Sequence, residues 1–159
     1  MRIVKLLVIS VVFIFLLLTA MSLLIPSRVR ISKAVNLQKS PDTIFSLIKD
    51  ENKWRMWHPM YIDSVSAEKW ENVRRSVVEN TDTSFILQLQ QPDRKPVTSA
   101  WVILLYQHTD SVTLQWYMDF RLGWYPWEKF SSMFYEKTYG VMMEQGLGNI
   151  KVLVTKKED

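Results

Sequence analysis

"GWYPWEKFSSMFYEK", residues 123–137, carries six aromatic rings within about four helical turns. Pro126 suits the first turn of a helix, and Glu128 then falls where the helix dipole favours an acid. The segment predicts a helix that runs to about Tyr139, where Gly140 can weaken or kink it. A helix with so many rings must cover an apolar surface, which the rest of the chain has to supply.

Residues 141–154 predict a second helical stretch. Its apolar residues recur at helical spacing, at Met142 or Met143, Leu147, Ile150 and Val154. Gly146 and Gly148 lower the intrinsic helix propensity of this stretch. Packing against another element must therefore stabilise it.

Four segments before these helices are rich in β-branched and aromatic residues: 73–80, 84–91, 97–108 and 111–122. Turn-prone clusters of hairpin length separate them, so we predict an antiparallel meander. Apolar and polar residues alternate in the last segment, which buries one face and leaves Asp119 solvated on the other. The segment before it is apolar on both faces, which predicts a central strand covered on both sides.

The residues before the meander predict one strand and two short helices. Alternation over residues 29–37 is typical of a half-buried strand. Ser40 can cap a helix, with proline following it at the first helical position. Trp54 and Trp57 lie three residues apart on one side of a second helical turn, which Pro59 ends.

The N-terminal run from Leu6 to Ile25 contains twenty uncharged positions, fifteen of them Leu, Ile, Val or Phe. A helix of this length crosses a hydrocarbon core of about 30 Å. Those fifteen residues favour insertion by about 5–9 kcal/mol, and Pro26 ends the helix at the interface. A cleaved signal peptide is the alternative, since Arg2 and Lys5 form a basic start. We favour a retained anchor, because the run is long and TAMSLLIPS offers no convincing cleavage site.

These features divide the chain into an anchor, residues 1–27, and one soluble domain, residues 28–159. Basic residues flank the span on both sides, so they do not predict which side of the membrane holds the domain. The anchor contributes two of the positive charges, and the remaining net charge of +2 is scattered, which argues against a nucleic-acid surface. The absence of cysteine fits either redox compartment.

Few residues in the sequence suggest catalysis. His58 and His108 lie far apart, and the chain has no cysteine, HExxH motif, glycine-rich phosphate loop or nucleophile elbow. Glu128, Glu136 and Glu144 repeat every eight residues, which predicts one solvent-facing side of the last helix. We therefore predict no catalytic residue, no metal ligand and no cofactor.

Two segments resemble the SRPBCC group, the START-like, polyketide-cyclase-like or Bet v 1-like proteins, in its bacterial membrane-anchored form. One is SPDTIFSLI-x5-W-x2-W-x-P, and the other is WYPWEKFSSMFYEK-x2-G-x5-GL-x-N. The residues that carry the likeness are Ser40, Pro41, Phe45, Trp54, Trp57, Pro59, Trp124, Pro126, Phe130, Phe134, Gly140, Gly146, Leu147 and Asn149. Both segments are packing signatures, so the resemblance concerns fold and no catalytic motif.

The resemblance implies an α+β helix-grip fold, in which a curved antiparallel sheet wraps a long C-terminal helix over a cavity. Phe130, Met133, Phe134 and Val141 would then face the sheet, with Trp54 and Trp57 at the mouth. The candidate cavity lining is Trp54, Trp57, Trp101, Leu114, Trp116, Met118, Phe120, Phe130, Met133 and Phe134. The alternative is that these side chains fill the interior and leave no usable cavity.

One departure from the family bears on cavity size. Relatives carry glycines between the tryptophan motif and the last strands, whereas this chain has none before Gly123. Residues 60–75 are also poor in strand signal, so strands of the full sheet could be short or missing and the cavity reduced.

We interpret the chain as a membrane-tethered, non-enzymatic helix-grip domain that binds a hydrophobic small molecule or lipid. Residues 6–25 would hold it at the membrane as a single N-terminal span. Two alternatives remain open: a filled interaction module whose exposed aromatics, such as Trp70 or Tyr125, dock an unknown protein partner, and an enzyme of cyclase or dehydratase type. The enzyme would need an acid or base in the pocket.

Overall fold

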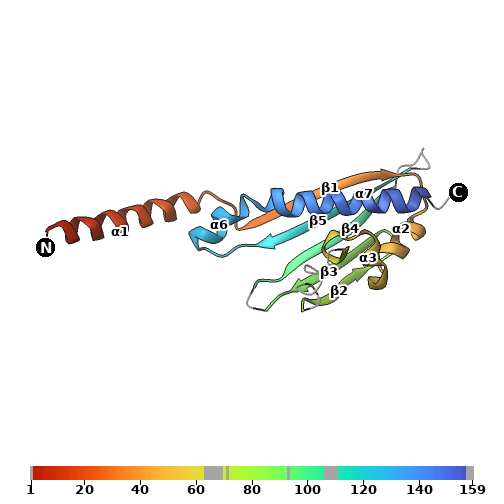
Figure 1. The fold of residues 1–159 in the computed structure, drawn as a ribbon, viewed down its shortest axis with the longest axis horizontal. Helices are drawn as coiled ribbons and strands as arrows, with labels where there is room; N and C mark the ends of the chain where they lie inside the picture. The colour runs from red at the N-terminus through yellow and green to blue at the C-terminus, as the bar shows by residue number, and fades with distance from the viewer. Residues whose placement is uncertain (1, 63–69, 71, 93, 106–110, 157–159) are drawn as a thin grey trace.

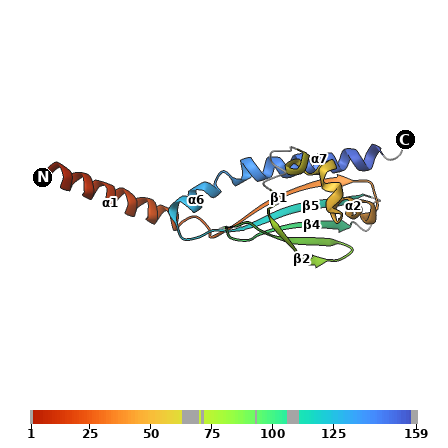
Figure 2. The same ribbon diagram turned by 60° about the horizontal axis from the view of Figure 1, so that its bottom comes forward.

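The computed structural model describes residues 2–62, 70, 72–92, 94–105 and 111–156, and in this part of the chain five strands form one antiparallel sheet. The strands are β1 (Arg28–Leu37), β2 (Arg74–Asn80), β3 (Ser84–Gln90), β4 (Val97–Leu105) and β5 (Val112–Arg121), and their order is β1-β5-β4-β3-β2. The sheet is curved, and the helices lie along one of its faces (Figure 2). The predicted meander and the predicted first strand are confirmed.

The register places the inward-facing residues of three strands side by side. Trp116 on β5 is opposite Lys33 on β1 and Trp101 on β4, and Phe120 is opposite Val29 and Val97. Because every second residue of β5 is buried, the predicted alternation of that strand is confirmed. Phe120 and Val97 therefore lie at the end of the sheet where β1 begins, and the Trp116 pairs lie farther along it.

The helices follow the predicted order with local differences. They are α2 (Pro41–Ile48), the short 3-10 turn η1 (Glu51–Lys53), α3 (Trp54–Trp57), α4 (Pro59–Ile62), α6 (Pro126–Ser132), the π-helical segment η2 (Glu136–Gly140) and α7 (Val141–Thr155). Ser40 occupies the predicted cap position of α2, but its hydroxyl pairs with Thr43 Oγ1 at 2.9 Å instead of a backbone N–H. The turn that carries Trp54 and Trp57 ends just before Pro59, as predicted, and Pro59 then starts the further short helix α4.

Helix α7 lies across the sheet and covers β1 and β5 (Figure 1). Its buried side chains are Met142, Met143, Leu147, Ile150 and Val154, the helical spacing expected from the sequence. At Gly146 the helix backbone comes so close to the sheet that an added Cβ would lie 2.9 Å from the ring of Trp116. Helix α7 therefore packs closely on the sheet, as a helix-grip fold requires. This close contact is possible because residue 146 has no side chain.

The face that α6 and η2 turn inward differs from the predicted one. Met133 and Phe134 are 67% and 63% exposed, and Val141 is also exposed, so the prediction that they face the sheet is wrong. Tyr135 and Tyr139 pack on Phe120 instead, each with 4.7 Å between ring centroids. The physical reason is helical spacing: Tyr135 and Tyr139 lie seven and three residues before the buried Met142 and share its side of the helix, whereas Met133 lies on the opposite side.

The outer face of the sheet is polar. Arg30 donates two hydrogen bonds of 2.6 Å to the carboxylate of Asp119, and Gln115 donates one of 2.8 Å to Ser32 Oγ. Leu104, on the same face of β4, is 43% exposed. β4 is central as predicted, but the prediction that it is covered on both sides is wrong, since antiparallel sheets can leave one face in water.

The N-terminal helix α1 (Arg2–Ser22) extends away from the domain (Figure 1). It is long and apolar enough to cross a membrane, and none of its most hydropathic window is buried against other described residues. A signal sequence near the N-terminus can meet the same criteria of length and composition. The helix meets the domain at α6, where the buried amino group of Lys129 donates a 2.9 Å hydrogen bond to the carbonyl oxygen of Ile25.

Candidate functional site

Half of the interior, beneath α3 and α7, is a solid aromatic cluster. Trp101 and Trp116 stack with 5.2 Å between ring centroids, and Trp57 meets both edge-on at 6.2 and 5.8 Å. Trp54 is 6.3 Å from Trp57 and is also buried. All four rings are buried in the packed core, so the prediction that Trp54 and Trp57 stand at a cavity mouth is wrong.

Hydrogen bonds lock the cluster in place. Trp54 Nε1 donates to the carbonyl of Ile48 at 2.7 Å, and Trp57 Nε1 donates to the carbonyl of Leu47 at 3.0 Å. Trp116 Nε1 donates to Ser99 Oγ at 2.9 Å. Trp101 Nε1 is buried and has no hydrogen-bond partner among the residues that the structure describes. The cluster therefore combines apolar packing with directional bonds to α2 and β4.

His58 lies inside this cluster and is 5% exposed. Its ring is 5.2 Å from the rings of both Trp57 and Trp116, and its Nδ1 accepts a 3.3 Å hydrogen bond from the backbone N–H of Met60. Burial lowers the pKa of His58 to about 3, because the charged imidazolium loses its hydration. A histidine that stays neutral here suits packing. His108 lies outside the described residues.

The lowered pKa of His58 predicts that the folded protein loses stability in mild acid. Its folded pKa of about 3 lies below the ordinary 6.5, so the unfolded chain takes up a proton first. The contribution to stability is complete above about pH 6.5 and falls by about 1.4 kcal/mol per pH unit below it. Between pH 6.5 and 4.5, urea unfolding of the full chain in detergent should show wild type losing about 2 kcal/mol more than His58→Phe. Parallel pH curves for the two proteins would contradict this.

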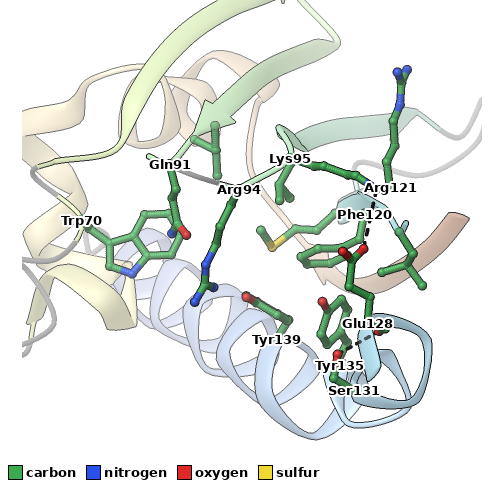
Figure 3. Close-up of a pocket in the computed structure, with 14 residues that line it drawn as sticks. Trp70, Gln91, Arg94, Lys95, Phe120, Arg121, Glu128, Ser131, Tyr135 and Tyr139 are labelled. Atoms are coloured by element: carbon green, nitrogen blue, oxygen red, sulfur yellow. Dashed lines mark hydrogen bonds and ion pairs between the residues drawn. The ribbon is translucent and has the colours of Figure 1, made fainter. Parts of the chain in front are cut away.

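The other half of the interior holds a pocket of about 490 Å³, at the end of the sheet nearest α1 (Figure 3). The ends of β3 and β5 and the beginning of β4 form its floor, and α6 and η2 form its roof. The described lining is Trp70, Leu89, Gln91, Arg94, Lys95, Val97, Met118, Phe120, Arg121, Leu122, Glu128, Ser131, Tyr135 and Tyr139. The volume lies within the range of small-molecule sites, about 300–1,000 Å³.

The pocket is apolar at its floor and polar at its edge. Arg94 reaches in between Trp70 and Tyr139, whereas Arg121 points away (Figure 3). Burial, together with Tyr135 nearby, raises the pKa of the Tyr139 phenol, and Arg94 partly opposes that rise. Tyr139 is therefore a neutral hydroxyl at physiological pH that can donate or accept a hydrogen bond.

Glu128 lies at the edge of the pocket and is engaged by neighbouring residues. Its carboxylate accepts a short hydrogen bond from the backbone N–H of Gly123 and lies 3.6 Å from the amino group of Lys95. It is half-buried, so the prediction that it faces solvent together with Glu136 and Glu144 is wrong. The other two are exposed, and each pairs with Lys33, at 2.7 and 2.6 Å.

The ten predicted lining residues fall into three groups. Met118 and Phe120 line the pocket. Trp54, Trp57, Trp101, Leu114 and Trp116 belong to the solid half of the core. Phe130 is half-buried outside the described lining, and Met133 and Phe134 face away from it. Both sequence interpretations, filled core and cavity, thus apply to different halves of one domain.

Sequence reasoning missed Tyr135, Tyr139 and the residues before β4. The two tyrosines are four residues apart and continue into Met142 and Gly146 at helical spacing, which is a readable signal. Leu89 and Val97 carried no such signal, because their place depends on the pairing of β3 with β4. The segment judged poor in strand signal, residues 60–75, includes positions outside the described residues.

No family model and no curated protein matches the sequence. Solved structures do share its fold. The di-domain ARO/CYC StfQ from the steffimycin biosynthetic pathway has a TM-score of 0.60 at 8% identity, over 82% of this chain and 51% of its own. XoxI from Bacillus cereus has a TM-score of 0.55 at 11% identity, over 82% of this chain and 98% of its own. A START superfamily protein from Mycobacterium smegmatis has a TM-score of 0.50 at 18% identity, over 78% and 98%.

These likenesses concern the fold. They place the protein in the α+β class in which a curved antiparallel sheet grips a long C-terminal helix. More particularly, the fold is SRPBCC-like, as the tryptophan and glycine motifs of the sequence predicted. Among the described residues, no three histidine, aspartate or glutamate side chains gather as metal ligands would.

Proposed function

We propose that this protein binds a hydrophobic small molecule or lipid in the pocket beneath Tyr135 and Tyr139, while α1 holds it at a membrane. The observation that carries the proposal is the division of the domain: one half of the core is filled by indole rings, and the other half borders a partly open pocket of about 490 Å³ with an apolar floor. A START superfamily protein and an ARO/CYC protein share the fold, which supports a ligand-binding role.

The lining favours an apolar ligand with one polar end. Val97, Met118 and Phe120 offer the apolar floor, whereas Arg94 and the Tyr139 hydroxyl offer hydrogen bonds at the edge. Apolar walls with a few placed polar groups are typical of small-molecule sites. Glu128 is the one carboxylate in the described lining, and its bonds to Gly123 and Lys95 favour a structural role over acid–base chemistry.

The place of the pocket supports a role at the membrane. β1 starts at Arg28, six residues after α1 ends, and its second residue, Val29, is opposite Phe120 in the pocket floor. A span of 21 residues is about 31 Å long, which matches the hydrocarbon core. An anchor of this kind would keep the pocket within reach of ligands that partition into the bilayer.

Native mass spectrometry of the detergent-extracted full chain tests the proposal. We expect a co-purifying small molecule on wild type and at least a tenfold lower bound fraction on Val97→Phe, because the larger ring fills the pocket. Val77→Phe is the matched control, since Val77 is an exposed strand valine outside the pocket, and it should retain the ligand. Equal loading of both variants, or a chain mass without residues 1–27, would refute the ligand site or the anchor respectively.

A further inference from the structure

Three aromatic rings at the start of α6 form a surface patch, which we call the aromatic patch: Trp124, Tyr125 and Trp127. Trp124 and Trp127 are 62% and 60% exposed, and Tyr125 is 39% exposed. The rings stack in a row, with 4.5 Å between the centroids of Trp124 and Tyr125 and 4.7 Å between those of Tyr125 and Trp127. Large aromatic rings gathered in water mark an interaction surface.

The segment that carries the patch is fixed to the domain and to the end of α1. Leu122 N–H donates a 2.9 Å hydrogen bond to the carbonyl of Ser27, and Gly123 N–H donates to the Glu128 carboxylate. Lys129 joins the first turns of α6 to Ile25, just beyond α1. The rings therefore have a defined position relative to the apolar helix.

That position coincides with the level at which α1 would leave a bilayer. α1 ends at Ser22 after a length equal to one hydrocarbon core, and α6 packs beside this end (Figure 1). Trp and Tyr are enriched at the membrane–water interface, because their rings are apolar and their N–H and O–H groups are polar. The patch thus has the residue types and the depth of an interfacial belt.

Two exposed arginines at the same end of the domain also indicate a lipid surface as the partner. Arg28 and Arg121 are exposed and directly opposite each other where β1 and β5 meet the linker to α1. Like charges placed opposite each other destabilise a sheet in water, whereas anionic lipid headgroups would attract both. A lipid surface would accommodate the aromatic rings and also attract the two arginines.

We propose that Trp124, Tyr125 and Trp127 insert into the headgroup region of the bilayer that α1 crosses. This second contact prevents the domain from swinging on its linker and keeps the anchor-proximal pocket close to the lipid surface. The inference rests on the proposed membrane span, and it adds a lipid-binding surface on the domain itself.

Fluorescence quenching of the full chain in vesicles of phosphatidylcholine and phosphatidylglycerol tests the inference. Brominated phosphatidylcholine quenches only rings that enter the bilayer. Of the seven tryptophans, Trp54, Trp57, Trp101 and Trp116 are buried in the core, and Trp70, which lines the pocket, is replaced by phenylalanine in every sample, so we expect the quenched signal to come from the patch. The double variant Trp124→Phe/Trp127→Phe should lose at least four-fifths of the quenched signal, because phenylalanine keeps the apolar contact but removes the emitting indole.

Two controls separate the possible failures. Trp54→Phe should leave the quenched signal unchanged, because Trp54 lies in the core. The chain has no cysteine, so a spin label on Leu16→Cys reports only the depth of α1. If that label is shielded from an aqueous nickel chelate and the patch is not quenched, α1 spans the bilayer and the patch serves a protein partner, which overturns this inference alone. If the label is reached by the chelate, the proposed span fails and the inference fails with it.

Discussion

Replacing Gly146 by leucine is expected to lower the free energy of unfolding by about 3–5 kcal/mol, because the side chain has no space to occupy. A Cβ at this position would lie 2.9 Å from the ring of Trp116 and 3.3 Å from the ring of Pro59. Trp116 is held in place by its hydrogen bond to Ser99 and by stacking on Trp101. Helix α7 would have to move away from the sheet to accommodate the leucine side chain.

Gly148, two residues along the same helix, provides the matched control. A Cβ there meets nothing within 4 Å. Gly148→Leu should therefore raise the free energy of unfolding by about 0.5–1 kcal/mol, since leucine has the higher helix propensity. Urea unfolding of the full chain in detergent, followed by near-ultraviolet circular dichroism, measures both variants. Equal effects of the two changes would show that α7 does not press on the tryptophan cluster.

Replacing Trp57 by alanine should cost about 3–5 kcal/mol. The indole is fully buried and touches the rings of Trp101, Trp116 and His58. Its loss would leave a cavity between α3 and α7 and also remove the hydrogen bond to Leu47. The near-ultraviolet signal of the cluster should weaken in the same variant, because its central ring is gone.

Trp127→Ala is the control for this loss. Its ring is exposed, so in detergent the change should alter the free energy of unfolding by less than about 0.5 kcal/mol. The two substitutions thus separate core tryptophans from those of the aromatic patch. A large destabilisation by Trp127→Ala would mean that the patch belongs to the core, and the membrane inference would lose its basis.

The two halves of the interior are packed differently. The cluster half ties α2, α3 and α7 to the sheet and holds the buried, neutral His58. The pocket half is bounded by α6 and η2, which meet the sheet through tyrosines instead of interlocked indoles. Substitutions around the pocket should therefore cost less stability than those in the cluster, since fewer packed atoms are lost. The tightly packed half thus adjoins the pocket in which we propose that a ligand binds.

Strands and helices were predictable from local residue patterns. Alternation in residues 111–122 and 29–37 predicted β5 and β1, because a strand with one buried face must repeat every two residues. The run from Leu6 to Ile25 predicted a helix that could cross a membrane, and α1 has that length and composition. The tryptophan and glycine motifs predicted the fold class, because they occupy the contacts between α3, α7 and the sheet.

The candidate site was less predictable. Phe134 and Tyr135 are adjacent and both aromatic, so composition could not decide which of them faces inward. The sequence contains two stripes at helical spacing, one through Phe130, Phe134 and Val141 and the other through Tyr135, Tyr139 and Met142. Sequence reasoning therefore chose Met133, Phe134 and Val141 for the inner face, and the structure buries Tyr135 and Tyr139 beside Phe120.

The amino-acid sequence by itself determined the elements, their order and the class of fold, because hydrophobic period and turn chemistry act between near neighbours. Tertiary structure alone decided where the interior is solid and where it is hollow. That outcome depends on strand register and on the phase of α7, which bring Trp101 onto Trp116 but leave a pocket beside Phe120 and Tyr139. Contacts between residues far apart in the chain set both, so no local pattern records them.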